Sequence, residues 1–420
     1  MRKKKIALLV AALALAAAGA LAAVFLLRDP PSGKLDTVLA GVTVVAPATT
    51  APDPSPPPPP VVVERAEGPC WLQFGGDPQR SLARPQIHLG KPVDKPLWTR
   101  GMGGYIEYPP SYCDGVLYVN TFNGKTAAVD ADTGRVIWTW VTDGLKPSTP
   151  AIDGPRLIVS STDGTVTGLD RTDGSVLWQI KTEAKVESSP VVVEGVAYFG
   201  ATDGRLFAVD PESGRILWAY DTGGRINASP SIWGRRVCIT TYAGSIFCLK
   251  RSDGTKLWST YVKRDALRYE SFYASPSTDG ERLYTVARSG KVVALDAETG
   301  AVLWTQHVNS LGYSTPAIAY GRVYVGGFDG ALRAYDAETG EVVWRSEVGG
   351  RILAPAVVIG DLVFFSTLET ETYAVQATDG KLVWHLGIGK YSPGIATEKR
   401  YYFSLNGILT AYRGELSPPE

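Results

Sequence analysis

Tryptophan recurs at a nearly constant spacing along most of this chain, and that spacing limits the folds available to it. Seven intervals separate eight such residues; six of the intervals are 40 residues long and one is 46. The repeated residues are Trp98, Trp138, Trp178, Trp218, Trp258, Trp304, Trp344 and Trp384. A fixed period of this length indicates that one supersecondary unit is repeated through the molecule.

Each repeat divides into four short segments of β-branched and aromatic residues, separated by turns that contain glycine. In a clear copy, the expected strands are residues 190–193, 197–201, 205–209 and 215–220. Glycine supplies the positive φ that tight hairpins need. Four antiparallel strands every 40 residues or so are typical of a β-propeller blade. A β-sandwich would not repeat its own sequence at a fixed period, and these segments are too short and too rich in glycine for a helical solenoid.

The number of blades follows from the ends of the repeat. A Gly-x-x-x-Trp motif begins seven times, at Gly134, Gly174, Gly214, Gly254, Gly300, Gly340 and Gly380. Trp98 has no inner strands before it, whereas the C-terminal segments 391–394, 401–404 and 408–412 have no tryptophan strand after them. Joining these two ends completes an eighth blade and leaves no open edge in the ring. We therefore predict an all-β, eight-bladed β-propeller of four-stranded antiparallel blades, closed by pairing an N-terminal strand with C-terminal strands.

The repeat resembles that of a known superfamily. The motif Ala-x-Asp-x-x-Thr-Gly-x-x-x-Trp is complete at residues 128–138, 294–304 and 334–344, and Trp71 to Arg80 precede the first blade. Over residues 70–414 the chain resembles the pyrroloquinoline-quinone (PQQ) repeat superfamily of eight-bladed propellers. The resemblance implies that each outer-strand tryptophan packs under the turn glycine of the next blade and joins the two blades.

Two branches of that superfamily imply different functions. The quinoprotein dehydrogenases have a vicinal Cys-Cys pair against the cofactor, a calcium held by Asp, Asn and Glu, and a longer chain. Here no two cysteines are adjacent, so the non-catalytic BamB-like branch is favoured, with no catalytic residues, metal or cofactor. No cysteine precedes Cys70, which departs from the assembly lipoprotein of that branch. The alternative is a PQQ-dependent dehydrogenase of alcohols or sugars, which would carry PQQ with calcium.

The N-terminal part of the chain predicts export. Basic residues 2–5 precede an apolar stretch, Ile6 to Leu27, which is long enough to cross a hydrocarbon core of about 30 Å. The basic flank places the N-terminus in the cytoplasm. We expect residues 1–28 to be a signal-anchor in the cell membrane, with the domain that follows on the extracytoplasmic side; the alternative is a cleaved signal and a secreted protein.

Residues 29–66 are rich in proline and predict an extended linker to a propeller of residues 67–420. Within the linker, residues 35–45 are apolar enough to form a strand that docks elsewhere.

Charge and motif content exclude several classes of function. The chain has 42 basic and 42 acidic residues and no basic run beyond its first five residues, so we expect no nucleic-acid partner. His88, His307 and His385 lie in different repeats, which argues against a shared metal site. The repeated aspartates precede turns, where Asp caps its own turn. These are Asp130, Asp170, Asp210, Asp296 and Asp336.

The four cysteines are expected to form two disulfides in an exported protein. Cys238 and Cys248 fall on the second and third strands of one blade, almost symmetrically about their turn. That register makes them cross-strand neighbours within reach of a bridge. Cys70 and Cys113 would then form the second bond and hold the segment before the first blade across the ring.

One insertion predicts where a partner binds. Five connections from a docking tryptophan to the next inner-strand proline take 12 residues, whereas Trp258 to Pro276 takes 18. Loops on a rigid scaffold often carry function, and arginine and aromatic residues concentrate at interfaces. The candidate partner residues in the insertion are Lys263, Arg264, Arg268, Tyr269, Phe272 and Tyr273. Equivalent positions around the same channel mouth are Glu107, Tyr108, Lys146, Glu187, Arg225, Asn227, Tyr313, Arg351 and Tyr391.

The alternative is a tolerated loop expansion without a ligand. Our leading expectation is a membrane-tethered, extracytoplasmic binding or scaffold module for a protein or cell-envelope ligand, which could be a carbohydrate or peptidoglycan.

Overall fold

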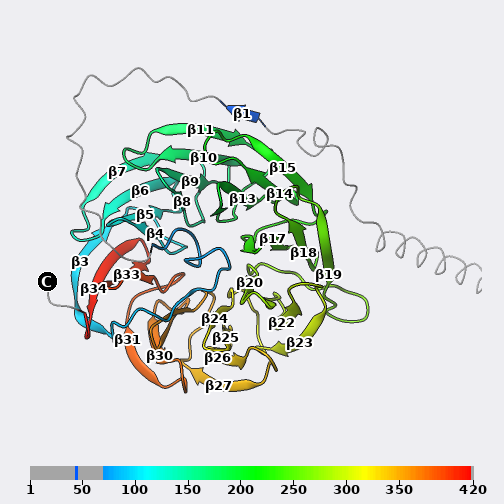
Figure 1. Ribbon diagram of the computed structural model, residues 1–420. Coiled ribbons are helices and arrows are strands. Elements are labelled where there is room, and N and C mark those ends of the chain that lie inside the picture. Colours follow the sequence, from blue (N-terminus) through cyan, green and yellow to red (C-terminus); the bar gives the residue numbers. More distant parts are fainter. Residues whose placement is uncertain (1–42, 46–69, 418–420) are drawn as a thin grey trace, which may run out of the picture.

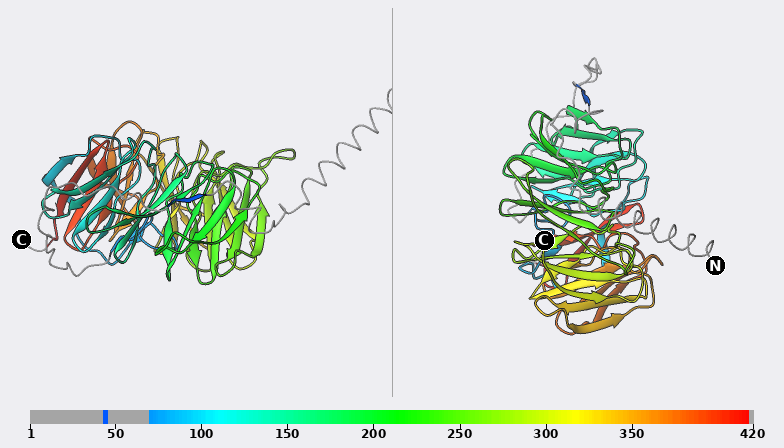
Figure 2. Two further views of the ribbon diagram at one scale, coloured as in Figure 1. Left: turned by 90° about the horizontal axis from the view of Figure 1, so that it is seen from above. Right: turned by 90° about the vertical axis from the view of Figure 1, so that its right-hand side faces the viewer.

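The structure is a computed structural model that describes residues 43–45 and 70–417. Eight β-sheets are arranged around a central axis, as Figure 1 shows, and the described residues contain no helix. Seen from the side in Figure 2, the ring is a broad disc. The predicted eight-bladed, all-β propeller is therefore confirmed.

Seven blades follow the chain in order. The first three are β4 (Ser111–Cys113), β5 (Val116–Asn120), β6 (Lys125–Asp130), β7 (Val136–Val141); β8 (Ala151–Asp153), β9 (Arg156–Ser160), β10 (Thr165–Asp170), β11 (Val176–Lys181); and β12 (Val191–Val193), β13 (Val196–Gly200), β14 (Arg205–Val209), β15 (Ile216–Asp221). The next two are β16 (Ser231–Trp233), β17 (Arg236–Thr240), β18 (Ser245–Lys250), β19 (Lys256–Tyr261); and β20 (Ser277–Thr278), β21 (Arg282–Val286), β22 (Lys291–Asp296), β23 (Val302–His307). The sixth and seventh are β24 (Ala317–Ala319), β25 (Arg322–Gly326), β26 (Ala331–Asp336), β27 (Val342–Glu347); and β28 (Val357–Ile359), β29 (Leu362–Ser366), β30 (Thr372–Gln376), β31 (Leu382–Leu386).

The eighth blade joins the two ends of the domain. Its strands are β32 (Ile395–Ala396), β33 (Arg400–Leu405), β34 (Ile408–Gly414) and, as the outer strand, β3 (Pro92–Gly101). β3 runs antiparallel to β34, with Thr99 opposite Thr410. The closure predicted from the incomplete terminal repeats is thus observed, and it removes the free edges that an open ring would leave at both ends.

Two short strands extend blades at their margins. β2 (Ala83–Arg84) runs parallel to the inner strand β28. β1 (Thr43–Val45) pairs antiparallel with the outer strand β11 and so adds a fifth strand to the second blade. The run at residues 35–45 therefore contains a docked strand, as its apolar character suggested. The rest of the predicted linker at residues 29–66 lies outside the described residues, as does the apolar stretch at residues 6–27. Among the residues that are described, no helix is long and apolar enough to cross a membrane.

The core lies between neighbouring blades. In the first blade β5 is buried along its whole length and β6 along all but its ends, whereas β7 alternates between half-buried and exposed residues. Blades pack face to face, so the middle strands are covered on both faces and carry runs of Val, Leu, Ala and aromatic residues. The outer strand faces solvent on one side.

Tryptophans join seven of the eight neighbouring pairs of blades. Trp138, for example, donates from Nε1 to the carbonyl oxygen of Arg171 at 3.0 Å and lies against Gly174 of the next blade. Trp384 differs from the prediction, because it does not dock on a turn glycine. Its target would be a turn from β34 to β3, but these strands come from opposite ends of the domain and no turn joins them. Trp384 instead stacks on Phe403 of β33, with ring centroids 5.5 Å apart.

The repeated aspartates cap turns, as predicted. Asp130 accepts hydrogen bonds from the backbone nitrogens of Asp132 and Thr133, at 3.1 and 2.8 Å, and from the Thr133 hydroxyl at 2.8 Å. Asp296 and Asp336 repeat the pattern. Carboxylates committed to their own turns are structural groups.

Candidate binding site at the channel mouth

The segment before β3, residues 70–91, crosses the channel of the propeller; we call it the leader. Residues 71–82 of the leader reach the innermost strand of all eight blades. The backbone nitrogens of Ile152, Ile232, Thr278, Ile318 and Val358 donate to leader carbonyls at 2.7 to 3.1 Å. Val192 donates to the Gln73 side chain at 2.9 Å, Trp71 and Tyr112 exchange backbone hydrogen bonds at 2.9 Å, and the Trp71 indole donates to the carbonyl of Ala396.

The inner strands of a propeller have one open edge each, facing the channel. In this protein each of these edges has a central backbone group that hydrogen-bonds to the leader. Such pairing is expected because buried backbone polar groups need hydrogen-bond partners. The leader therefore fills the part of the channel that it crosses.

Arg80 fixes the leader from within. Its guanidinium is fully buried and donates to the carbonyl oxygens of Phe74, Ser189 and Pro230. Burial lowers the Arg80 pKa to about 9, although the neighbouring Asp77 opposes the shift. The guanidinium also lies 5.2 Å from the centre of the Phe74 ring. Arg80 thus connects the leader to the entries of two inner strands.

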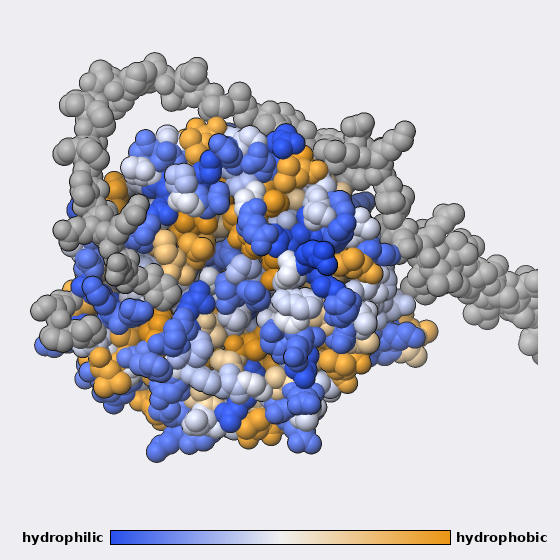
Figure 3. Space-filling view, viewed as in Figure 1, coloured by the Kyte–Doolittle hydropathy of each residue, from blue (hydrophilic) through white to orange (hydrophobic). Residues whose placement is uncertain are grey.

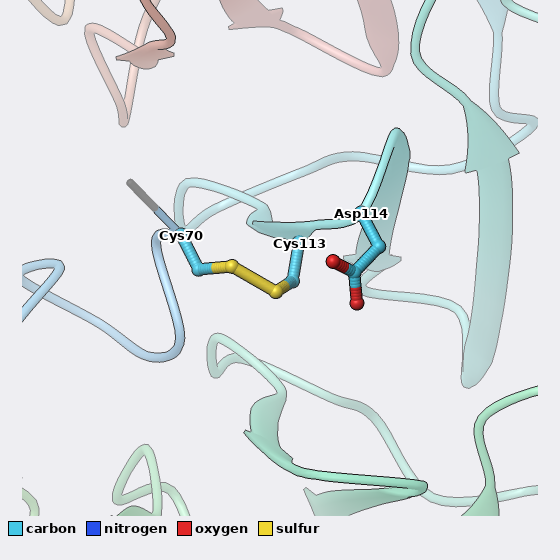
Figure 4. A group of neighbouring side chains, drawn as sticks. All are labelled: Cys70, Cys113 and Asp114. Atoms are coloured by element: carbon cyan, nitrogen blue, oxygen red, sulfur yellow. A yellow bond between two sulfur atoms is a disulfide. The ribbon is translucent and has the colours of Figure 1, made fainter. Parts of the chain in front are cut away.

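The disulfides are Cys70–Cys113 and Cys238–Cys248, as predicted, and the described residues include no free cysteine. The first bond joins the start of the leader to β4 (Figure 4). Asp114 lies beside this bond and forms the one grouping of possible metal ligands found within the described part of the chain. Disulfide sulfurs are not thiolates, and Asp114 already pairs with Arg171 at 2.7 Å. The grouping is therefore structural.

A cavity of about 240 Å³ remains at the mouth of the channel, beside the leader. Its walls come from the connections that lead into the inner strands of the first blade and of the fifth to eighth blades, and Phe74 of the leader also lines it. The lining residues are Phe74, Glu107, Tyr108, Pro109, Tyr273, Ser275, Tyr313, Thr315, Leu353, Ala354, Pro355 and Tyr391. Five of these twelve side chains are aromatic and none is basic.

Two carboxyl groups dominate the electrostatics of the cavity. Burial, and secondarily the charge of Glu187, raise the pKa of Glu107 to about 7. No hydrogen bond or ion pair joins the Glu107 carboxyl to another described residue. Glu187 is better compensated, because it accepts a hydrogen bond from Asn227 and lies 3.8 Å from the Arg225 guanidinium. Negative charge at Glu107 therefore lacks a partner among the residues that the structure describes.

Aromatic side chains continue around one side of the mouth. Tyr242, Tyr273, Tyr313 and Phe328 form a chain of ring contacts with centroids 5.5 to 6.3 Å apart. Burial, and then the nearby charges of Glu107 and Glu187, raise the pKa of Tyr273 above its ordinary value. These four aromatic side chains thus present neutral rings beside two acidic groups.

The insertion forms a small hairpin that projects from the edge of the ring beside β19 (Figures 1 and 2). Lys263 pairs with Tyr269, and the Arg264 nitrogen donates to the Arg268 carbonyl at 2.9 Å. Asp265 closes the turn by accepting backbone hydrogen bonds and pairing with Arg268 at 2.7 Å. The tip residue Leu267 is 94% exposed. An apolar side chain presented between basic ones is available for contact with another molecule.

The structure gathers some of the predicted partner residues and separates others. Glu107, Tyr108, Tyr273, Tyr313 and Tyr391 line the one cavity described above. The Glu187, Arg225 and Asn227 group lies beside it, whereas Lys263, Arg264, Arg268 and Tyr269 are on the projecting hairpin. Arg351 pairs with Glu369 at 2.8 Å on the surface.

Three predicted partner residues require correction because they are buried. One is Asn227, which is 4% exposed and donates to Glu187. The other two are Phe272 and Lys146. Phe272 is fully buried and pairs with Ala287 in the core, so it cannot touch a partner. Lys146 is 2% exposed; its ammonium donates to the carbonyl of Gly124 and lies 4.3 Å from the centre of the Trp140 ring. Phe272 and Lys146 lie in connections from an outer strand to the next inner strand, as predicted. Sequence position alone does not say which side chains of such a connection turn inward.

Sequence reasoning missed Phe74, Leu353 and the exposed tip Leu267. The pattern around the channel mouth was read from positions equivalent between blades, and the leader has no equivalent. Leu267 is neither charged nor aromatic, so residue type does not mark it as an interface residue; its place at the centre of the insertion is the signal that does.

The cavity does not fit PQQ. That cofactor carries three carboxylate groups, and none of the side chains that line the cavity is basic, whereas Glu107 is acidic. The basic groups around the cavity already have partners. Arg225 pairs with Glu187, and Arg80 donates to three carbonyl oxygens. Arg288 donates to the Tyr313 hydroxyl at 2.8 Å, and Lys390 lies 5.1 Å from the centre of the Tyr391 ring. Binding a tricarboxylate here would place like charges together without compensation.

No broad apolar patch is seen on the face of the molecule that Figure 3 shows. Hydrophilic residues cover most of that face, and apolar residues form separate small patches. Scattered apolar side chains are ordinary on a protein surface. This view therefore offers no alternative docking surface.

The fold and its repeated tryptophan joints define an eight-bladed propeller of the PQQ-repeat superfamily. The chain matches the family model described as outer membrane protein assembly factor BamB over residues 88–263 and again over residues 244–400. These matches span more than half of the sequence, and the chain belongs to that family. Comparison with curated protein sequences gives no match.

Solved structures with the same fold include both branches of the superfamily. BamB from Moraxella catarrhalis has a TM-score of 0.67 and 18% identity, with 76% of this chain and all of that chain covered. A europium-containing methanol dehydrogenase has a TM-score of 0.70 and 13% identity, covering 82% and 98% of the two chains. Quinohemoprotein alcohol dehydrogenase from Comamonas testosteroni has a TM-score of 0.69 and 13% identity, covering 93% and 84%. At such identities these likenesses show the fold alone.

Proposed function

We propose that this protein is a membrane-tethered, extracytoplasmic propeller that binds a protein or cell-envelope ligand at the channel-mouth face and catalyses no reaction. The observation that carries the proposal is the path of the leader, which crosses the channel and hydrogen-bonds to the inner strands, with a cavity of about 240 Å³ beside it at the mouth. Membership of the BamB family supports a binding role. The tether rests on the apolar stretch at residues 6–27 of the sequence.

The geometry of the face supports binding of another macromolecule. The cavity and the insertion meet at Tyr273, which lines the cavity and ends the inserted connection. The inserted connection therefore runs from the exposed hairpin tip to the wall of the cavity, and a macromolecule large enough to cover it would contact both. Rigid blades hold both features in place, so little conformational entropy is lost on binding.

Site-specific photocross-linking of the full chain in its native membrane tests the proposal. A photoreactive residue in place of Leu267 should form an adduct with a partner. One in place of Glu338, in a turn between the third and fourth strands on the other face, should form none. Adducts from Glu338 alone would place the interface on the wrong face, and adducts from neither position would contradict the binding role.

Two further measurements address the non-catalytic and membrane parts of the proposal. With PQQ and calcium added, the purified protein should reduce no dye with alcohols or aldoses; reproducible turnover would favour the dehydrogenase. Protease added outside intact cells or spheroplasts should cut the linker and release the propeller. An N-terminus that begins after residue 28 would instead indicate a cleaved signal.

A further inference from the structure

We propose that the channel-mouth cavity binds an alkylammonium group, supplied by a lysine side chain of a polypeptide partner. This inference rests on the proposed function, because it requires a partner at the channel-mouth face. It adds the chemical class that the site recognises, and it follows from three independent features: the aromatic walls, the uncompensated carboxyl group and the hydrogen-bond acceptors of the cavity.

The walls favour a cation. Phe74, Tyr108, Tyr273, Tyr313 and Tyr391 surround the cavity with ring surfaces, and the face of an aromatic ring attracts ammonium groups. Cations of the protein itself already lie over one ring beside the cavity and over one of its walls. Arg225 lies 5.6 Å from the centre of the Tyr242 ring, and Lys390 lies 5.1 Å from that of Tyr391.

The charge balance favours a cation over a neutral group. Glu107 has no ion-pair or hydrogen-bond partner among the described residues, and Glu187 lies close enough to raise its pKa. The cavity lining contains no lysine or arginine. A neutral sugar would leave the repulsion between the two carboxyl groups in place, whereas an ammonium group would relieve it.

The acceptors favour a primary ammonium over a quaternary one. A lysine ammonium has three donors and no acceptor. The cavity offers the Glu107 carboxyl and the hydroxyls of Ser275 and Thr315, together with tyrosine hydroxyls. The aliphatic part of a lysine side chain would pack against Leu353 and Pro355. A quaternary group would leave the Glu107 carboxyl without a donor, whereas Ser275 and Thr315 already accept backbone hydrogen bonds from Ser229 and Ser275.

Binding should depend on pH, because the cation requires Glu107 in its charged form. The groups that face Glu107 are Glu187, Tyr108 and Tyr273, with Arg225 beyond Glu187 and Arg80 beyond Tyr108. On the other walls of the cavity, Tyr313 accepts a hydrogen bond from Arg288, and Lys390 lies over the Tyr391 ring. With the Glu107 pKa at about 7 in the free protein, the charged fraction falls about tenfold from pH 8 to pH 6. The apparent affinity should fall by about the same factor.

Ligand titration of the full chain in detergent, with ¹³C-labelled tyrosine followed by NMR, tests the inference. The probe is n-butylammonium, and 1-butanol is its neutral counterpart of equal size. We expect butylammonium to shift cavity tyrosine signals saturably and at least tenfold more tightly than 1-butanol. Equal affinity for the two probes would overturn the assignment of the cavity to a cation.

Variants locate the site. Glu107→Gln should weaken butylammonium binding about tenfold and abolish its dependence on pH, and Tyr391→Leu should weaken it by removing one wall. Glu369→Gln, at an ion pair with Arg351 outside the cavity, is the matched control and should bind as the wild type does. Unchanged binding by both Glu107→Gln and Tyr391→Leu would overturn the proposed site.

Two longer probes distinguish the source of the ammonium. The tripeptide acetyl-Gly-Lys-Gly-amide should bind more tightly than glycerophosphoethanolamine, since the phosphate of the latter would face the carboxyl groups. The reverse order would overturn the polypeptide source. If a partner is cross-linked at Leu267 but butylammonium does not bind, the cation inference fails and the proposed function stands. If butylammonium binds and no partner is captured, the proposed function fails and the preference of the cavity for an ammonium group stands.

Discussion

Trp98 of β3 packs directly on Gly134 of the first blade and so joins the outer strand contributed by the N-terminal part of the domain to the next blade in the ring. Its indole donates to the carbonyl oxygen of Ala131 at 3.0 Å. Gly134 has a φ of +69°, and a Cβ atom added there would lie 2.5 Å from the indole ring. Both the backbone conformation and the contact therefore require glycine.

Gly134→Ala should destabilise the propeller more than a glycine substitution without such a contact. Gly154 is the matched control, because its φ is +53° and nothing lies within 4 Å of an added Cβ. Both variants carry the left-handed backbone cost of about 1–2 kcal/mol, and Gly134→Ala adds about 1–3 kcal/mol of steric overlap. Chemical denaturation measures the difference. Equal midpoints for the two variants would show that the tryptophan joint contributes no constraint.

The two disulfides should contribute unequally to stability. Their cysteines are 43 and 10 residues apart, so the chain-entropy model assigns about 4 kcal/mol to Cys70–Cys113 and about 3 kcal/mol to Cys238–Cys248. Replacing both cysteines of a pair by serine and measuring unfolding tests this order. The exported protein should also show no alkylation mass shift without reductant; two or more labelled thiols would contradict the pairing.

Lys146→Met should stabilise the protein at neutral pH. Burial is the main cause that lowers the Lys146 pKa to about 7, from an ordinary value of 10.5. The unfolded chain therefore binds more protons than the folded one between these values, and wild-type stability should rise as pH increases from about 7 to about 10. The Gly124 carbonyl keeps its hydrogen bond from Thr142 at 3.0 Å when the ammonium is removed.

Urea denaturation of wild type and Lys146→Met at pH 7 and pH 10 measures this effect. The variant should lose the increase in stability between the two pH values. A variant that is less stable than wild type at pH 7 would mean that the contacts with Gly124 and Trp140 outweigh the cost of burying the charge.

The insertion should separate binding from stability. Replacing Arg264 and Arg268 together by alanine should leave the melting temperature nearly unchanged, because both side chains are exposed. It should also abolish cross-linking from a photoreactive residue kept in place of Leu267. Phe272→Ala, at a fully buried position in the same connection, should cost about 3–5 kcal/mol. A stable Phe272→Ala variant would contradict the packing of this connection. Retained cross-linking from position 267 in the double variant would exclude Arg264 and Arg268 as contacts.

The sequence determined the repeat and therefore most of the architecture. The spacing of Trp98 to Trp384 gives the period of the repeat, the glycines mark the turns, and the incomplete terminal repeats indicate the closure of the ring. Each of these features is a local requirement of one strand or turn. The pairing of Cys238 with Cys248 follows for the same reason: strand register places them opposite each other, as the structure has them.

Tertiary structure alone decided what occupies the channel and which side chains face it. The leader has no counterpart in the repeat, so its hydrogen bonds to all eight inner strands and the buried Arg80 could not be read from periodicity. Phe272 and Tyr273 are neighbours in sequence, yet one is core and the other lines the cavity. Trp384 shares the repeated motif but lacks a glycine to meet, because ring closure replaced that turn by two chain ends. Such outcomes depend on contacts between segments far apart in the chain, and no local pattern encodes them.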